Sequence, residues 1–191
     1  MTKFILLFLC WVLYFFLHSW LAGTSAKHFA KTSFKFSDRS YRIFYVTLSS
    51  VGLILLLVFN SNIPAVLFFS NEGWLRYLSL VLTAFGVIII KVSFREYNFE
   101  AFMGVRNPEG EAFSSNGILS KVRHPIYAGT ILIVLGYFLF NPTMPTLVSM
   151  SCIFLYLPLG IYLEEQKLIK LYGEKYRKYK EEVPALFPTL F

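Results

Sequence analysis

Five long apolar runs constrain this 191-residue chain more than any other feature of its sequence. A helix needs about 20 mostly apolar residues to cross a bilayer, and a helix satisfies all its backbone polar groups within lipid. The runs approach that length and alternate with polar segments: residues 4–22, 41–59, 75–90, 126–140 and 145–163. The sequence therefore predicts an all-α integral membrane bundle of five transmembrane helices that forms a single membrane domain over residues 1–191.

The charged residues are few, and their distribution predicts an orientation. They make up 15% of the chain, against about 25% in soluble domains. Sixteen of the 18 lysines and arginines lie in residues 23–42, 91–123 and 164–191, whereas the gaps 60–74 and 141–145 hold none. Five spans put the three basic segments on one face, which the positive-inside rule makes cytoplasmic. We therefore expect the N-terminus outside and the C-terminus cytoplasmic, and the bilayer rather than nucleic acid explains the net charge of +7.

The two cysteines and the first apolar run have simple interpretations. Cys10 and Cys152 each lie within an apolar run, so they are expected to be small core residues, with no disulfide framework and no metal site. The first run lacks a small-residue cleavage site, and we interpret it as a retained span rather than a signal peptide.

The last two spans and the tail predict a distinct local architecture. The segment 141–145 reads Asn-Pro-Thr-Met-Pro, which indicates a tight turn and hence a helical hairpin of the fourth and fifth spans. After it, apolar residues recur at helical spacing, with Gly173 interrupting the run: Leu168, Leu171, Tyr172, Tyr176 and Tyr179. This predicts a cytoplasmic amphipathic C-terminal helix. It either lies on the membrane surface or folds back as a lid over the bundle.

A polar motif precedes the fourth span. It reads Arg123-His124-Pro125-Ile126-Tyr127-Ala128-Gly129. Pro125 suits the first turn of a helix, where its missing N–H is not needed. A helix N-terminus beside Arg123 and His124 suits a carboxylate or phosphate group. The alternative is an Arg that snorkels from the membrane beside an interfacial His and Tyr.

Two adjacent acids, Glu164 and Glu165, lie where the fifth span leaves the membrane. Neighbouring helix positions differ by about 100° in direction, so at most one of the two points squarely into the bundle. They are either helix-end acids paired with Lys167 or Arg123, or acceptors for ribose hydroxyls or a cationic group.

These clusters in this order resemble the isoprenylcysteine carboxyl methyltransferase family. The shared pattern is Arg-His-Pro-x-Tyr-x-Gly, a helical hairpin, Glu-Glu, Gly-x-x-Tyr-x-x-Tyr and Val-Pro, over about residues 94–188. The resemblance implies three N-terminal spans over residues 1–93 and a cofactor-binding and catalytic half over residues 94–191.

The resemblance also implies an enzyme that transfers a methyl group from S-adenosylmethionine, with the cofactor bound on the cytoplasmic side. It assigns the cofactor pocket to His124, Pro125, Tyr127, Gly129, Glu164, Glu165, Tyr176 and Tyr179. Among these, Glu165 is a candidate catalytic residue together with Arg123. Catalysis would depend mainly on alignment and on exclusion of water, with no metal or covalent nucleophile.

The resemblance further implies a lipophilic or thiol small-molecule acceptor, whose class stays open between a thiol, a prenylcysteine carboxylate and a lipid amine. Residues 99–107 and 18–22 resemble the bacterial thiol-methyltransferase and NnrU-like branches. Members that act on prenylcysteine carry an Arg just before Val-Pro, whereas this chain has Glu182 there, with Lys180 two residues earlier. A carboxylate at that position disfavours an anionic acceptor.

Three further residues and two other functions complete the set of hypotheses. His18, near the inner end of the first span, is a candidate catalytic base for a thiol, or else a helix-end His bonded to a backbone carbonyl. Glu96 and Glu100 either face the site or are solvated. The alternative functions are a non-catalytic membrane accessory protein of the same fold and a nicotinamide-dependent membrane reductase. The sequence leaves the oligomeric state undetermined.

Overall fold

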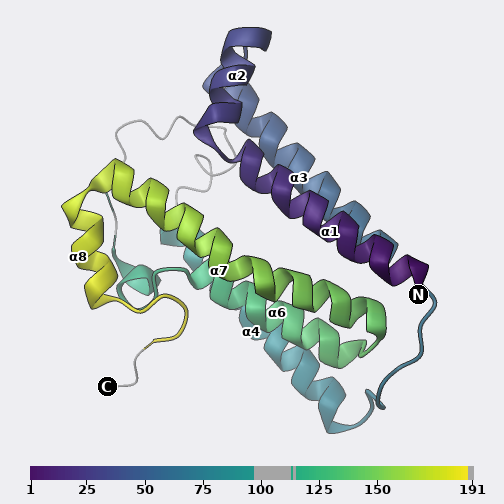
Figure 1. Cartoon of the computed structure of the whole chain (residues 1–191). Helices are drawn as coiled ribbons and strands as arrows, with labels where there is room; N and C mark the ends of the chain where they lie inside the picture. Colours follow the sequence, from purple (N-terminus) through teal and green to yellow (C-terminus); the bar gives the residue numbers. More distant parts are fainter. Residues whose placement is uncertain (97–112, 114, 189–191) are drawn as a thin grey trace. The chain divides into compact units, whose positions relative to one another are not determined.

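The computed structural model describes residues 1–96, 113 and 115–188. Over these residues the chain is helical and contains no strand, which confirms the predicted all-α class. The helices are α1 (Thr2–Leu21), α2 (Thr24–Phe34), α3 (Asp38–Ser61), α4 (Trp74–Glu96), the 3-10 helix η1 (Gly117–Ser120), α6 (Pro125–Phe140), α7 (Met144–Tyr172) and α8 (Glu174–Glu182) (Figure 1).

Four of the helices have the length and apolar composition of membrane spans. These are α1, α3, α4 and α7, whereas α6 is apolar but has only 16 residues. In the most apolar stretch of α1 and of α3, 11% of the residues are buried within the protein. The other side chains there need a non-aqueous environment, which a bilayer provides. The chain is therefore an integral membrane protein, while the count of five spans and the hairpin of α6 with α7 stay predictions.

Internal contacts divide the chain into two compact units. Of the described residues, the first unit holds 1–66 and 143–152, and the second holds 67–96, 113, 115–142 and 153–188. Helix α7 contributes its first turns to the first unit and the remainder to the second. The boundaries of these units differ from the predicted halves, residues 1–93 and 94–191. The single domain with those two halves stays a prediction.

Buried polar contacts hold the first unit together. The indole nitrogen of Trp11 donates to Ser149 Oγ at 2.8 Å, and Ser149 Oγ donates to Asn60 Oδ1 at 2.9 Å. Trp11 and Asn60 are 1% and 2% exposed. Each buried polar group would otherwise carry an uncompensated desolvation cost, so the chain of bonds links α1, α3 and the start of α7.

Small residues let α4 and α6 pack closely in the second unit. Gly86 on α4 faces Gly129 on α6, so that a Cβ on Gly86 would lie 2.5 Å from the Gly129 carbonyl oxygen. Two helical turns further along α6, a Cβ on Gly136 would lie 2.7 Å from the Ser79 carbonyl oxygen. Membrane helices gain van der Waals contact in this way where no side chain separates their backbones.

Two glycines at the ends of short elements have positive φ. Gly173 (φ 59°) separates α7 from α8, which confirms the predicted interruption. Gly117 (φ 56°) begins η1, and a Cβ there would lie 2.0 Å from a carboxylate oxygen of Glu96. Residues with a side chain rarely adopt such φ values, and at Gly117 the Glu96 side chain would also have to move.

We predict that Gly86→Ala destabilises the protein by about 1–3 kcal/mol, because the new methyl group meets backbone atoms that cannot rotate away. Thermal unfolding in detergent, followed by far-UV circular dichroism, measures the change. Gly160→Ala is the matched control, because its Cβ would lie 3.4 Å from the nearest atom, an ordinary contact. A melting temperature lowered equally by both variants would contradict the proposed packing.

Candidate active site

The segment that follows α8 is bound to the start of α6 in the second unit. The backbone N–H of Arg123 donates to the Pro184 carbonyl and that of His124 to the Ala185 carbonyl, each at 2.9 Å. His124 is the N-cap of α6, and Pro125 is its first helical residue, as the sequence predicts. The segment after α8 is therefore fixed against the polar motif by main-chain hydrogen bonds.

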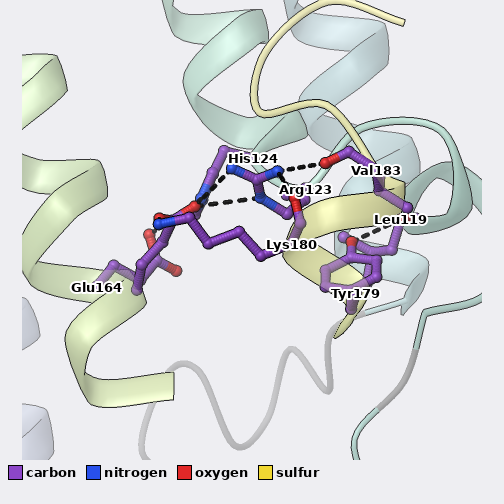
Figure 2. A network of polar contacts seen from close by, with 8 residues as sticks. Leu119, Arg123, His124, Glu164, Tyr179, Lys180 and Val183 are labelled. Atoms are coloured by element: carbon purple, nitrogen blue, oxygen red, sulfur yellow. Dashed lines mark hydrogen bonds and ion pairs between the residues drawn. The ribbon is translucent and has the colours of Figure 1, made fainter. Parts of the chain in front are cut away.

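Arg123 joins three segments through its guanidinium group (Figure 2). Its Nε and Nη2 atoms donate to Glu165 Oε1 at 3.1 and 2.8 Å. Its Nη1 atom donates to the Lys180 carbonyl at 2.8 Å and to the Val183 carbonyl. With a side chain that is 9% exposed, Arg123 connects α7, α8 and the tail.

Glu165 accepts from three partners and is itself 4% exposed. Besides Arg123, the His124 Nε2 atom lies 3.1 Å from Glu165 Oε1 and the Lys180 Nζ atom 2.6 Å from Glu165 Oε2. For His124 to donate, its Nε2 must carry the proton. A carboxylate with several charged donors is stable in a buried position that it could not occupy alone.

Glu164 completes the cluster from a more open position. Its Oε2 atom lies 3.5 Å from His124 Nδ1, and its side chain is 38% exposed. With a neutral imidazole, the charges of Arg123 and Lys180 balance those of the two acids. The sequence predicted that at most one acid points inward, and the different burial of Glu164 and Glu165 agrees with this.

Two tyrosines of α8 lie in an aromatic cluster beside these charges. Tyr179 donates to the Leu119 carbonyl at 2.6 Å, and burial raises the pKa of its hydroxyl to about 12. Tyr176 is 2% exposed, and its hydroxyl has no hydrogen-bond partner among the described residues. Burial, and next the negative charge of Glu165, raise the pKa of Tyr176. A buried hydroxyl without a partner is uncommon in folded proteins.

The other three site candidates of the polar motif, Tyr127, Pro125 and Gly129, form none of the ion pairs described above. Tyr127 lies edge-on to the His124 ring at 5.6 Å, and its hydroxyl lies 3.5 Å from where a Cβ on Gly160 would be. Pro125 is fully buried. Gly129 packs against Gly86 of α4, so helix packing accounts for its small size, and its cofactor-binding role stays a prediction.

His18 belongs to the first unit and has polar partners there. Its Nδ1 atom lies 3.2 Å from Ser49 Oγ, and its Nε2 atom lies 3.2 Å from the Tyr45 hydroxyl. The Tyr14 ring stacks on the imidazole at 5.8 Å. These contacts position the ring, and the role of His18 as a catalytic base stays a prediction.

One residue of the charged cluster, Lys180, was not predicted as a site residue, and the candidates Glu96 and Glu100 are not part of the described cluster. From the sequence, Lys180 was noted only for its position two residues before Glu182, yet it lies one helical turn after Tyr176, which places it on the same face of α8. Glu96 lies beside Gly117 in the second unit. Glu100 and the segment 99–107, with Arg106, lie outside the described residues.

The helical membrane fold and the Arg-His-Glu cluster agree with the resemblance to isoprenylcysteine carboxyl methyltransferases that the sequence motifs carry. The family model described as "NnrU protein" matches residues 6–187. The chain therefore belongs to the NnrU family, which confirms the relationship expected from the sequence motifs.

Curated relatives support the same class. The chain is 29% identical over 185 residues to a methanethiol S-methyltransferase of a Pseudomonas species, covering 87% of this chain and 67% of the relative. It is 32% identical over 159 residues to a methanethiol S-methyltransferase of Crocosphaera subtropica (76% and 60%). It is 27% identical over 121 residues to a protein-S-isoprenylcysteine O-methyltransferase of Xenopus laevis (61% and 42%). The chain thus spans from two fifths to two thirds of these relatives, and no solved structure matches it.

We predict that Glu165→Gln destabilises the protein by about 3–5 kcal/mol, because it leaves the buried guanidinium of Arg123 without its counter-charge. Glu164→Gln is the matched control, since that carboxylate is half-open and has one long contact with His124. Denaturant or thermal unfolding in detergent distinguishes the two variants. Equal stability of both would mean that the charge pair does not hold the site together.

Proposed function

We propose that this protein is an integral membrane methyltransferase that transfers a methyl group from S-adenosylmethionine to a thiol or a prenylcysteine-type acceptor. The buried hydroxyl of Tyr176, which has no hydrogen-bond partner in the described part of the chain and feels the charge of the Glu165 carboxylate, carries the proposal. The names of the relatives, methanethiol S-methyltransferase and protein-S-isoprenylcysteine O-methyltransferase, support it.

The residues present fit the proposed cofactor chemically. S-adenosylmethionine carries an ammonium group, a sulfonium, ribose hydroxyls and an aromatic base. Glu164, with 38% of its side chain exposed, offers a carboxylate to a cation or to ribose hydroxyls. Tyr176 offers a hydroxyl without a partner among the described residues. The rings of Tyr176, Tyr179 and Phe113 form an apolar cluster, whose faces suit a cation or a stacked base.

In this proposal the protein acts mainly by positioning. When bound, S-adenosylmethionine supplies an electrophilic methyl group on a good leaving group. Arg123 and Glu165 hold α7, α8 and the tail in one arrangement, which fixes the groups that orient the reactants. The buried tyrosines keep water away from the transfer. His18 Nε2, next to the Tyr45 hydroxyl, stays the proposed acceptor of a thiol proton.

The charges of the site favour a neutral acceptor over a carboxylate within this proposal. Arg123 donates to Glu165 and to two carbonyls, and Lys180 pairs with Glu165. A substrate carboxylate would have to replace one of these partners. Glu182, which forms a surface pair with Lys178 at 3.8 Å, adds negative charge to α8 and supports the same preference for a thiol.

Calorimetric titration with S-adenosylhomocysteine, the expected product, tests the function. We predict that the wild type binds this ligand and that Tyr176→Phe weakens the affinity about tenfold. This factor corresponds to the free energy of one hydrogen bond to a buried hydroxyl. Without ligand, Tyr176→Phe should keep its stability, whereas Tyr179→Phe should lose about 1 kcal/mol with its bond to Leu119.

Tyr162→Phe is the control for this titration, because Tyr162 lies on α7 with 58% of its surface exposed. No binding by folded wild-type protein would refute the methyltransferase. Titration with a reduced nicotinamide dinucleotide would then separate a reductase from an accessory protein that binds neither. Binding that Tyr176→Phe leaves unchanged would refute the proposed pocket alone.

We also propose that the N-terminus lies outside and that the C-terminus and the cofactor site are cytoplasmic. The concentration of 16 of 18 basic residues in three alternate segments supports this. Fluorescent protein fused after Phe191 should fluoresce, whereas alkaline phosphatase at the same point should be inactive. The reverse result would invert the orientation.

A further inference from the structure

The corner that connects α1 to α3 lies at one end of the first unit. Helix α1 ends at Leu21, α2 spans Thr24–Phe34, and α3 begins at Asp38. Because α1 and α3 pack against each other and are long enough to span a membrane (Figure 1), the residues between them lie at a membrane surface. None of the function proposed above uses this corner.

The corner is held in a defined shape. Ala26 and Ala30 of α2 are buried against Tyr41 of α3, together with Phe36. The Tyr41 hydroxyl donates to the Leu21 carbonyl at 2.7 Å, which attaches α3 to the end of α1. The Ser37 side chain caps α3 by accepting from the Ser40 N–H at 3.1 Å. Any site at this corner is therefore largely formed before a ligand arrives.

Positive charge at the corner exceeds negative charge. Asp38 pairs with two lysines, because the Nζ atoms of Lys27 and Lys31 each lie 2.7 Å from its carboxylate. One carboxylate cannot neutralise two ammonium groups. Lys35 and Arg39 are exposed, and among the described residues neither forms an ion pair with an acid. Together these five residues carry a net charge of +3.

The surplus charge borders a hollow in the surface. This open hollow of about 460 Å³ is lined by Lys31, Lys35, Phe36, Ser37, Asp38 and Arg39. Three of its six lining residues are cationic, and Ser37 adds a hydroxyl. Lys35 has left-handed backbone angles (φ 55°, ψ 30°) at the end of α2, which is where the chain turns towards Arg39. The hollow has room for a phosphate group and favours an anion.

An aromatic row runs beside this hollow and distinguishes a lipid from a soluble anion. Ring centroids are 6.0 Å apart for Phe29 and Phe34, 6.2 Å for Phe34 and Phe36, and 6.0 Å for Phe36 and Phe44. Phe29 and Phe34 are 55% and 65% exposed. Exposed rings at a membrane surface enter the headgroup and acyl boundary, so anion-binding cations and lipid-facing rings are side by side.

We propose that this corner is a binding site for the phosphate headgroup of an anionic phospholipid. Lys35 and Arg39 contact the phosphate, and Phe29 and Phe34 pack against the glycerol and upper acyl chains. The combination of basic residues with an apolar anchor is the one that favours anionic membrane lipids. The site does not depend on the proposed methyl transfer.

Electron paramagnetic resonance of spin-labelled lipids tests the site. The full chain is reconstituted in phosphatidylcholine vesicles that contain a trace of labelled phosphatidylglycerol or labelled phosphatidylcholine. The protein-restricted fraction of each label gives their relative association. A Lys or Arg near an anionic lipid contributes about fivefold, so we expect a preference for phosphatidylglycerol of at least about that size.

Variants assign the preference to the hollow. The double variant Lys35→Gln with Arg39→Gln should bring the ratio of phosphatidylglycerol to phosphatidylcholine association close to one. The double variant Lys35→Glu with Arg39→Glu should reverse the preference. Lys170→Gln with Lys178→Gln, two exposed lysines elsewhere, should leave it unchanged, and unfolding curves identify any variant that fails to fold. A preference that the control lowers as much, or that neither hollow variant lowers, overturns the proposal. So does its loss on adding inorganic phosphate at matched ionic strength, which would identify a soluble anion site.

Discussion

The buried ion pair of Arg123 with Glu165 is the contact on which the second unit depends. Each ion alone would cost several kcal/mol to bury, so each requires the other in place. Arg123 uses its remaining N–H groups on the carbonyls of Lys180 and Val183. In this way one electrostatic requirement holds the start of α6, the C-terminal part of α7 and the tail together (Figure 2).

The sequence predicted most of the elements because their signals are local. Apolar runs, Pro125 at a helix start and Gly173 between two helices depend on neighbouring residues, and all appear where expected. The sequence also indicated that Arg123, His124 and Glu165 share one site, although that inference depended on their order in a resembling family. The periodicity of apolar residues predicts which face of a helix is buried, but not which other segment packs against that face.

What the sequence could not predict depends on contacts between distant segments. Gly129 was assigned to the cofactor pocket through the family resemblance, and only the structure brings it against Gly86. Lys180 was not among the candidate site residues, because its pairing with Glu165 depends on the turn at Gly173. The short helix α2 was not predicted. It lies in the basic segment between the first two apolar runs, and its mixed composition resembles that of a loop. Its role appears only when Ala26 and Ala30 pack against Tyr41.

The backbone conformation of Gly173 is one that amino acids of the L configuration disfavour. Its backbone angles (φ 59°, ψ −134°) are the mirror image of the extended, polyproline-like conformation that L-residues favour. Apart from Gly173 itself and its two chain neighbours, no atom of the described residues lies within 4 Å of the position that its Cβ would occupy, so the constraint is one of chirality and not of space. A D-alanine would adopt this turn readily, whereas each of the chiral amino acids that a ribosome inserts would strain it. The direction in which α8 leaves α7, and with it the placement of Tyr176 and Lys180, therefore depends on one achiral residue.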